Sequence, residues 1–114
     1  MSKDCIFCRI VAGEIPAKLV HQDGEVVAFE DVNPQAPTHV LVVPRAHIPR
    51  ALDVKPEHFS LLGRIFEVAS RIARERSLEE GFRLVVNNGP QAGQTVYHLH
   101  FHLLGGRGMK WPPG

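Results

Sequence analysis

The chain has 114 residues, of which 44% are hydrophobic and 22% are charged. This length predicts a single domain over residues 1–114 with one core, and the composition excludes collagen, low-complexity disorder and coiled coil. Thirteen Lys and Arg residues against twelve Asp and Glu leave a net charge of +1. A charge this small gives no electrostatic basis for binding nucleic acid or a membrane surface.

The sequence contains no segment near the roughly 18 consecutive apolar residues that a membrane span needs. No apolar signal-peptide core follows the first four residues, so we expect an intracellular, cytoplasmic protein. The two cysteines, Cys5 and Cys8, are three residues apart. In a reducing compartment this spacing indicates metal binding or redox chemistry before it indicates a disulfide.

Local signals predict one short helix, one long helix and five strands. The short helix covers residues 5–12, with Asp4 as N-cap and Gly13 as its end. The long helix runs from Pro56 to about Arg76. The expected strands, in chain order, cover residues 18–22, 25–31, 38–43, 82–87 and 95–104.

Two further patterns indicate how these elements are arranged. Asp23-Gly24 stands between the first two strands and is a strong hairpin signal. The long helix has a wide apolar stripe and an expected Glu67–Arg71 pair on its outer face. The stripe consists of Phe59, Leu62, Ile65, Phe66, Ala69, Ile72 and Ala73. These features predict an α+β fold, a five-stranded antiparallel sheet covered by a helix, followed by an extended tail over residues 105–114.

The chain contains seven histidines, and three of them alternate with large apolar residues near its end. His98, His100 and His102 share one face of the expected last strand, because side chains two residues apart point the same way. The apolar residues between them belong to the core. The preceding loop, residues 88–94, is rich in glycine and can turn backbone N–H groups toward an anion.

Three interpretations of this face compete. It is a polar outer surface, a zinc site or a phosphate-handling site with a histidine nucleophile. Chelation by all three imidazoles is awkward, because the outer two are about 13 Å apart along a strand. The glycine-rich loop that leads directly into the alternating histidines favours the phosphate-handling site. A neutral imidazole is a good nucleophile, and roughly three-quarters of a histidine with an ordinary pKa is neutral at pH 7.

The stretch from Gly93 to Leu104 (GQTVYHLHFHLL) resembles the signature of the histidine-triad superfamily. It is most similar to the branch of nucleoside phosphoramidate hydrolases often called Hint. Residues 15–18, 34–39, 85–87 and 111–114 also look like Hint segments in the same order. The resemblance therefore covers nearly the whole chain and implies a histidine-triad fold that forms a homodimer.

The resemblance implies a covalent mechanism. His100 attacks the α-phosphorus of a nucleotide, and water then hydrolyses the nucleotidyl-histidine intermediate to a nucleoside monophosphate. His102, His39 and the backbone from Gly93 to Thr95 contact phosphoryl oxygens. The carbonyl of His98 holds the far ring N–H of His100. Without the resemblance, His39 could equally be a satisfied core histidine.

Further substrate contacts follow from the same resemblance. Asp31 binds the ribose hydroxyls, Val32 lines the sugar, and Asn87 contacts the phosphate or the ribose edge. The side chains that enclose the base are Ile6, Phe7, Ile10 and Phe29, and the loop residues Gln94 and Val96 complete the substrate-binding set. The alternative for these apolar side chains is a place in the core, and for Asp31 it is turn formation.

Thr95 differs from the serine that eukaryotic Hint chains usually carry there, where the hydroxyl helps protonate the leaving amine. Threonine keeps that donor, so we expect the same reaction. The tail places Trp111 at the active site of the partner chain in the implied homodimer, which we expect to form through the long helix and the tail.

The Cys5–Cys8 spacing also resembles bacterial members that hold a structural zinc with two histidines. The candidate ligands are Cys5, Cys8, His47 and His98, a closed Cys₂His₂ set. The alternative is two reduced helix cysteines, one of them buried as a small hydrophobic residue. Catalysis itself needs no cofactor, because in-line attack by His100 requires no metal.

Three functions are consistent with these features. The first is hydrolysis of purine nucleoside 5′-phosphoramidates, such as adenosine 5′-monophosphoramidate or aminoacyl adenylates, to AMP. The second is a dinucleoside polyphosphate hydrolase of the same superfamily. The third is a zinc-stabilised interaction module whose nucleotide site only binds. The terminal Trp-Pro-Pro-Gly favours the first, because it resembles the tail of Hint.

Overall fold

A computed structural model describes residues 4–114, so the first three residues of the predicted 1–114 domain lie outside the described part. The chain forms one five-stranded antiparallel sheet in the order β1-β2-β3-β5-β4. These strands are β1 (Leu19–Gln22), β2 (Val26–Glu30), β3 (Thr38–Pro44), β4 (Phe82–Val85) and β5 (Phe101–Gly105). The helices are α1 (Ile6–Val11) and α2 (Phe59–Glu75). The predicted α+β class, sheet and pair of helices are therefore confirmed.

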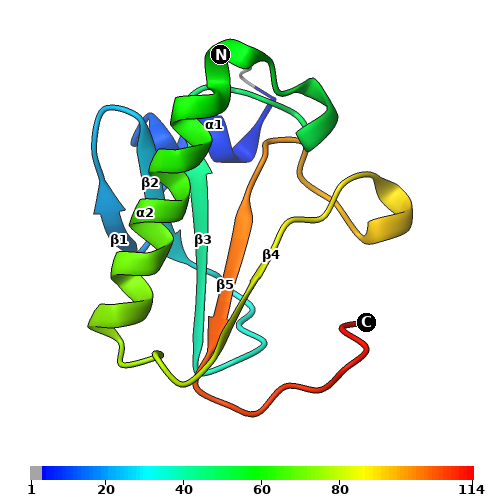
Figure 1. Ribbon diagram of the computed structural model, residues 1–114. Helices are drawn as coiled ribbons and strands as arrows, with labels where there is room; N and C mark the ends of the chain where they lie inside the picture. The colour runs from blue at the N-terminus through cyan, green and yellow to red at the C-terminus, as the bar shows by residue number, and fades with distance from the viewer. Residues whose placement is uncertain (1–3) are drawn as a thin grey trace.

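The sheet lies between the two helices, and alternate residues of its strands face opposite sides (Figure 1). Val26 and Ala28 of β2 belong to the core beneath α2. Val27 and Phe29 face the other way and contact α1. All seven residues of β3 are buried, because both of its faces are covered. The smaller α1 side is the one on which the predicted site residues gather.

The long helix differs from its prediction at its start and in its buried face. Residues Pro56–His58 form a 3₁₀ turn, so the α-helix begins only at Phe59. Phe59 and Phe66 are 60% and 54% exposed. The buried face contains Leu61, Ile65, Val68, Ala69, Ile72 and Ala73. The buried face therefore differs from the predicted stripe: Leu61 and Val68 are buried, whereas Phe59 and Phe66 lie at the edge of the face. Glu67 pairs with Arg64 instead of Arg71.

The short helix begins at a different cap from the one predicted. Cys5, and not Asp4, is the N-cap of α1, and its Sγ accepts a hydrogen bond from the Cys8 N–H at 3.3 Å. Gly13 has a φ of +79°, as its predicted role at the helix end requires. A cysteine at the cap therefore sets where the helix starts and brings both thiols to the same end of it.

The predicted last strand is too long at its start. β5 begins at Phe101, whereas residues 95–100 lie outside any strand and bend at residues 96–98. The β3–β5 ladder ends at the Val42–Phe101 pair. The next position on β3 that could donate is Pro44, which has no N–H. The Leu99 N–H instead donates to the Ile48 carbonyl at 2.6 Å.

Two further strands are shorter than expected. β4 ends at Val85 instead of Asn87, and β2 covers Val26–Glu30 within the predicted 25–31.

The structure also bears on the expectation that the chain does not span a membrane. Across residues 4–114, no helix combines the length and apolar character needed to cross a bilayer.

Asp23 at the first hairpin ties the sheet to α2. Its Oδ1 accepts the Glu25 and Val26 N–H groups, and its Oδ2 lies 2.8 Å from the Arg64 guanidinium. The same Oδ2 is 2.6 Å from His21 Nε2. Burial alone raises the pKa of Asp23, but the hydrogen bonds it accepts and the Arg64 charge outweigh burial and hold that pKa far below its ordinary value.

We predict that Asp23→Ala lowers the free energy of unfolding by about 2 kcal/mol and Asp23→Asn by about 1 kcal/mol, because Asn keeps the turn acceptor. Urea unfolding measures both changes. The depressed pKa means that the stabilisation is complete above about pH 4, the unfolded value, and is lost as pH falls toward the folded value. A difference between wild type and Asp23→Asn that persists undiminished at pH 2 would contradict the assignment.

Candidate active site and metal cluster

The histidine run keeps its predicted alternation although only its last member lies in a strand. Leu99, Phe101 and Leu103 all belong to the core beneath α2. His98, His100 and His102 face the α1 side but take separate partners. The zinc alternative in which these three imidazoles chelate one ion is not supported, because no metal-capable group within residues 4–114 contains all three.

His100 has one ring nitrogen fixed by the backbone. Its Nδ1 lies 2.7 Å from the His98 carbonyl oxygen, as the family resemblance implies. A carbonyl only accepts hydrogen bonds, so Nδ1 carries the proton and Nε2 keeps its lone pair. Burial lowers the pKa of His100, although its hydrogen bond to His98 and the charge of Asp31 oppose this. The ring is therefore neutral at pH 7.

The lone pair of His100 Nε2 reaches the surface even though the residue is only 7% exposed. Among the described residues, every side-chain nitrogen or oxygen that is fully buried has a hydrogen-bond partner. Nε2 of His100 has no such partner within this part of the chain, so it is accessible. The Phe7 ring stands edge-on to the imidazole at 5.0 Å and walls one side of it.

His39 and His102 form a hydrogen-bonded pair next to His100. The Gln35 N–H donates to His39 Nδ1 at 3.0 Å, so the proton of neutral His39 is on Nε2. This Nε2–H faces His102 Nδ1 at 2.9 Å and Asp31 Oδ2 at 3.3 Å. His102 Nδ1 is consequently an acceptor, and the proton of His102 is on Nε2.

Asp31, His39 and His102 lie close enough to hold a metal ion, but their hydrogen bonds oppose it. Their nearest ligand atoms are within 4.8 Å of one another. His39 would have to bind through Nε2, which carries the proton because Nδ1 is occupied by the Gln35 N–H. A metal ligand must offer a lone pair. This group is therefore a hydrogen-bonded chain.

Burial keeps both members of the pair neutral. The pKa of His39 is lowered by burial, against the charges of Asp31 and Glu30. The pKa of His102 is lowered to about 4, first by burial and then by His100 and His39, with Asp31 opposing. His102 Nε2 is thus a neutral donor across the physiological pH range.

Asp31 forms the turn that was its alternative role, whereas its contact with ribose stays a prediction. Its Oδ1 accepts the Asn33 N–H at 2.8 Å and shapes the turn after β2. Its Oδ2 faces His39.

The apolar residues predicted around the base divide into two groups. Phe7 and Phe29 are buried and stack edge-to-face at 5.4 Å, so both are core residues, and their contact with a base stays a prediction. Ile10 is partly buried against the same cluster. Ile6 and Val32 are 47% and 101% exposed and remain available to a ligand.

The glycine-rich loop is held by one buried amide. Gln94 Oε1 accepts the Gly89 N–H at 2.9 Å, and its Nε2 donates to the carbonyls of Pro49 and Val96. Gly93 is in the left-handed region with a φ of +84°. The side chain of Gln94 is therefore committed to the loop. Thr95 is exposed, whereas Val96 and Asn87 are half-buried.

The four predicted zinc ligands come together, and their ligand atoms all lie within 4.8 Å of one another. Cys8 Sγ is 3.2 Å from His47 Nδ1, and Cys5 Sγ is 3.4 Å from His98 Nδ1. Tetrahedral zinc with ordinary bond lengths places sulfur and nitrogen ligands about 3.5 Å apart. The donor set and its spacing therefore fit a structural zinc.

His98 is already oriented for such a metal. Its Nε2–H donates to the Pro44 carbonyl at 2.7 Å, which leaves the Nδ1 lone pair facing the thiols. Burial lowers the pKa of His98 to about 4 despite this hydrogen bond. The sequence did not indicate that the Pro44 carbonyl orients His98 or that the Gln35 N–H orients His39. Both contacts are made by backbone atoms, so the residue types at these positions carry no signal of them.

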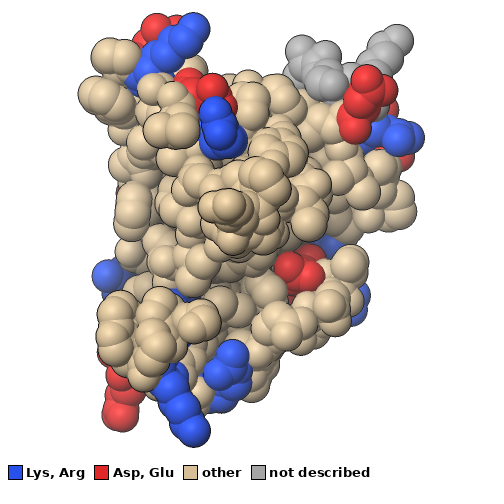
Figure 2. Space-filling view, turned by 90° about the vertical axis from the view of Figure 1, so that its right-hand side faces the viewer, with Lys and Arg blue, Asp and Glu red and all other residues tan. Residues whose placement is uncertain are grey.

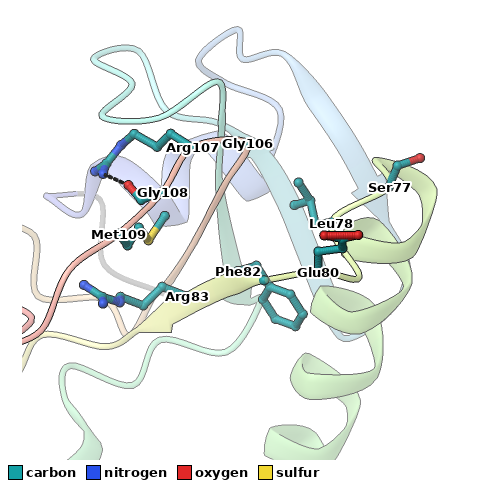
Figure 3. Close-up of a pocket in the computed structure, with 10 residues that line it drawn as sticks. Ser77, Leu78, Glu80, Phe82, Arg83, Gly106, Arg107, Gly108 and Met109 are labelled. Carbon is teal, nitrogen blue, oxygen red and sulfur yellow. Dashed lines mark hydrogen bonds between the residues drawn. The ribbon is translucent and has the colours of Figure 1, made fainter.

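Among the surface cavities formed by residues 4–114, two lie beside predicted site or tail residues. One of about 300 Å³ is lined by the cluster residues Cys5 and His47 and by the loop residue Thr95, together with Asp4, Ile6, Val96 and Tyr97. The other, of about 630 Å³, lies between the end of α2 and the tail, where Leu78, Phe82 and Met109 meet Arg83 and Arg107 (Figure 3). Trp111 in the tail is 83% exposed. The first cavity joins the metal cluster to the loop before the histidines.

Comparison with known proteins identifies the family. The family model described as the HIT domain matches residues 12–109. The chain belongs to the HIT family. It is 49% identical to a HIT family hydrolase from Legionella pneumophila, whose crystal structure superposes with a TM-score of 0.95 and covers 97% of this chain and 100% of that one.

Two curated relatives cover the same length. An uncharacterised HIT-like protein from Synechococcus elongatus is 52% identical over 114 residues, the whole of both chains. A 14 kDa zinc-binding protein from Brassica juncea is 44% identical over 113 residues, which are 97% of this chain and all of the relative. The histidine-triad resemblance read from the sequence is thus confirmed for the superfamily.

The low pKa of His102 predicts sensitivity to acid. Because its folded pKa is depressed, neutral His102 contributes its full stability above about pH 6.5, and this contribution is lost as pH falls toward 4. With a discount for partial exposure, His102→Gln should remove about 1 kcal/mol of the stability lost between pH 7 and pH 5. Denaturant unfolding at both pH values measures this, and identical pH dependence in the two proteins would contradict it.

Proposed function

We propose that this HIT protein hydrolyses purine nucleoside 5′-phosphoramidates, such as adenosine 5′-monophosphoramidate, and the related anhydrides, the aminoacyl adenylates, to AMP. The observation that carries the proposal is the state of His100. One nitrogen is locked as a donor to a backbone carbonyl, and the other is an accessible lone pair on a neutral ring. This is the form of imidazole that attacks phosphorus. The name of the Legionella relative, a HIT family hydrolase, supports a hydrolytic reaction.

The reaction proceeds in two displacements. His100 Nε2 bonds to the α-phosphorus while the bond to the leaving group breaks: the P–N bond of a phosphoramidate, whose amine leaves with a proton, or the P–O bond of an aminoacyl adenylate, whose carboxylate leaves. Water then attacks the nucleotidyl-histidine, and the P–Nε2 bond breaks to give AMP and free His100. Thr95, which is exposed, is the proposed proton donor to the amine, and its hydroxyl regains a proton from the water that attacks in the second displacement.

His102 stabilises the charge that develops on the phosphoryl oxygens. Its Nε2–H is a neutral donor because its Nδ1 accepts from His39. His39 has both ring nitrogens engaged and is 4% exposed, so we assign its effect on phosphate to the orientation of His102. The backbone from Gly93 to Thr95 supplies further N–H groups to the same oxygens.

The base and sugar occupy the α1 side of the sheet in this proposal. The exposed side chains of Ile6 and Val32, and the cluster that includes Ile10, Phe7 and Phe29, offer apolar surface for a purine. Asp31 reaches the ribose hydroxyls, and Asn87 the phosphate or ribose edge. A purine ring gains most from such contacts, because it has a large apolar face and a polar rim.

We propose that Cys5, Cys8, His47 and His98 hold a structural zinc. A closed four-ligand set leaves no position for substrate, so the metal supplies folding energy and no catalytic step. The name of the Brassica juncea relative, a zinc-binding protein, supports this assignment. Cys5 and Cys8 do not form a disulfide with each other, which suits the reducing cytoplasm we propose as the compartment.

A zinc-stabilised module that only binds nucleotide is the second candidate, and the metal cluster favours it as much as the enzyme. A dinucleoside polyphosphate hydrolase, the third candidate, would use the same nucleophile. One experiment distinguishes these three functions. An enzyme accumulates a covalent nucleotidyl intermediate, a binding module does not, and turnover of an adenosine phosphoramidate beside a diadenosine polyphosphate separates the two enzymes.

We propose a second copy of the chain as the protein partner. The half-exposed rings of Phe59 and Phe66 on α2 and of Phe82 on β4 leave apolar surface uncovered. Figure 2 shows the side of the molecule on which β4 and the tail lie, with uncharged side chains across its middle and most charged ones along the edges. Apolar surface of this kind is typical of a symmetric interface.

Removing the nucleophile should abolish turnover. We expect His100→Ala to lose nearly all activity while nucleotide affinity changes by less than about tenfold, because the ring contributes chemistry more than binding. Steady-state kinetics and calorimetry with AMP measure these effects. His58→Ala, a substitution in the 3₁₀ turn before α2, is the control and should keep full activity. Residual turnover of His100→Ala at a tenth of the wild-type rate would sink the assignment.

Substitution of His102 should cost less. We expect His102→Ala to lose about 3 kcal/mol of transition-state stabilisation, the amount typical of one oxyanion donor. His39→Ala should give a similar loss in kcat, since it acts through the same donor. A small loss of kcat for His39→Ala beside a large loss for His102→Ala would contradict the proposal that His39 acts by orienting His102.

Metal analysis of protein purified without an affinity tag should find about one zinc per chain. Chelation should lower the melting temperature, because the metal binds only the folded cluster. Protein that contains no metal and melts at the same temperature after chelation would make Cys5 and Cys8 packing residues only.

Removing the tail should alter selectivity. Deletion of residues 111–114 should change the preference among amine leaving groups, because in the proposed dimer Trp111 reaches the partner's site. Affinity for AMP should be unchanged, because AMP has no leaving group. Light scattering at micromolar concentration should give the mass of two chains. A single-chain mass would refute the dimer, and an unchanged preference in the truncated dimer would refute the role of the tail alone.

A further inference from the structure

The tail over residues 105–114 is held where it leaves β5. Gly106 has a φ of +91° and turns the chain out of the sheet. Arg107 then donates from Nε to the Gln35 carbonyl at 3.0 Å and from Nη1 to the Gly108 carbonyl at 3.1 Å. Figure 1 shows the tail running from this point past β4 and ending beyond that edge of the sheet. The root of the tail therefore has a defined direction, away from the sheet of its own chain.

Beyond the root, one hydrogen bond holds the tail. Arg83 Nη2 donates to the Lys110 carbonyl at 2.7 Å. Within the described residues 4–114, no other hydrogen bond, ion pair or ring contact involves residues 109–114. Met109 is half-buried at the wall of the cavity of about 630 Å³, whereas Lys110 and Trp111 are exposed. Packing therefore restrains Met109, and the Arg83 hydrogen bond restrains the residue immediately before Trp111.

Arg83 lies on the edge strand of the sheet, on the face that carries the histidines. The strand order leaves β4 paired only with β5. Leu84 and Val86 pack against the core beneath α2. Because side chains alternate along a strand, Arg83 and Val85 point to the opposite face, where Val85 is paired with His102. The residue that anchors the tail is thus part of the same rigid sheet that positions the histidines.

The chemistry of this contact makes it a specific anchor. A guanidinium is a charged donor, so its hydrogen bond to a carbonyl is stronger than one between neutral groups. Its planar shape also fixes the direction in which it donates. Figure 3 shows Arg83 leaving β4 on the side of the cavity where Arg107 and Met109 of the tail lie. Because the acceptor is a backbone carbonyl, the contact depends on Arg83 and not on the side chain of Lys110.

We propose that Arg83 is the positioning residue for Trp111 and that it thereby sets the selectivity for the leaving group. The inference rests on the proposed function and on the proposed dimer, in which Trp111 reaches the partner's site. Lys110 and Trp111 are adjacent, so an anchor on the Lys110 carbonyl confines the indole to a small volume. A tail released at Lys110 samples many more positions, which lowers the effective concentration of the indole at the leaving group.

Only leaving groups large enough to touch the indole should depend on Arg83. Adenosine 5′-monophosphoramidate releases ammonia, which has no surface for the ring to contact. The corresponding phosphoramidate of benzylamine releases an aromatic amine that can stack on the indole. The ratio of kcat/KM for the benzylamine compound to kcat/KM for adenosine 5′-monophosphoramidate is therefore the selectivity that Arg83 should control.

The test compares Arg83→Met with Arg83→Lys in the full-length chain. Methionine keeps an unbranched stem but has no donor, whereas lysine keeps the charge and one N–H donor group. Arg71→Met is the matched control, because it removes the same charge from an exposed position on α2. Lys110→Met tests whether the lysine side chain matters. The measurements are ¹⁵N order parameters of residues 109–111, fluorescence anisotropy of Trp111, which is the only tryptophan in the sequence, mass by light scattering, AMP affinity and the selectivity ratio.

We expect order parameters of about 0.8 at residues 109–111 in the wild type and below about 0.6 in Arg83→Met, with a lower anisotropy of Trp111. The selectivity for benzylamine should fall at least about fivefold in Arg83→Met, toward that of the chain lacking residues 111–114. Turnover of adenosine 5′-monophosphoramidate and AMP affinity should stay within about twofold. Arg83→Lys should recover part of both the order and the selectivity, and Arg71→Met and Lys110→Met should behave as the wild type.

A tail that is as ordered in Arg83→Met as in the wild type would overturn the anchoring role, as would an equal loss of order in Lys110→Met. A mobile tail with unchanged selectivity would overturn the role in specificity. Arg83→Gln, which has a shorter side chain, takes the place of Arg83→Met if that variant does not fold, with the same expectations.

The order of the tail is measured without substrate. A protein that hydrolyses nothing would therefore refute the proposed function, while the order parameters still decide whether Arg83 anchors Trp111. A single-chain mass with an ordered wild-type tail and a mobile Arg83→Met tail would refute the dimer and the role in selectivity but leave the anchor in place.

Discussion

The hydrogen bond from His100 to the carbonyl of His98 is the interaction on which the site depends. It fixes the tautomer of a neutral, nearly buried ring and leaves one nitrogen free. A buried imidazole with neither nitrogen fixed would divide its proton between two positions. The other buried histidines follow the same rule. His39 is set by the Gln35 N–H and His98 by the Pro44 carbonyl, so backbone groups determine the protonation of three rings.

These backbone groups are in place because the sheet separates two environments. One face packs on α2 and carries the larger of the two apolar clusters, while the other holds the histidines and a smaller apolar cluster with α1. Pro44 stands where the two meet. It ends the β3–β5 ladder, which lets the chain before β5 leave the sheet, and its carbonyl is then available to His98. The irregular approach to β5 is therefore part of how the site is built.

Much of this arrangement was predictable from the sequence. Alternation of histidine with leucine and phenylalanine placed the core face correctly, because that pattern depends only on the period of an extended chain. The Cys₂His₂ set was also predicted, from spacing and resemblance. The start of β5 was not, since the alternation continues through residues that have no ladder partner. Neither was the α2 face, where Phe59 and Phe66 are hydrophobic but lie at its edge. The tautomers of the histidines could not be predicted from the sequence, because they depend on backbone atoms that only the folded chain brings next to the rings.

The loop before the histidines depends on a single side chain with two chemically different ends. Gln94 accepts from Gly89 with its oxygen and donates to Pro49 and Val96 with its nitrogen. A glutamate of the same shape would have no protons for the two carbonyls, and a lysine would have no acceptor for the N–H. An asparagine would carry the right atoms on a shorter arm. Position 94 therefore tolerates few substitutions although its side chain does no chemistry, and a search for catalytic groups by mutation alone would mistake it for one.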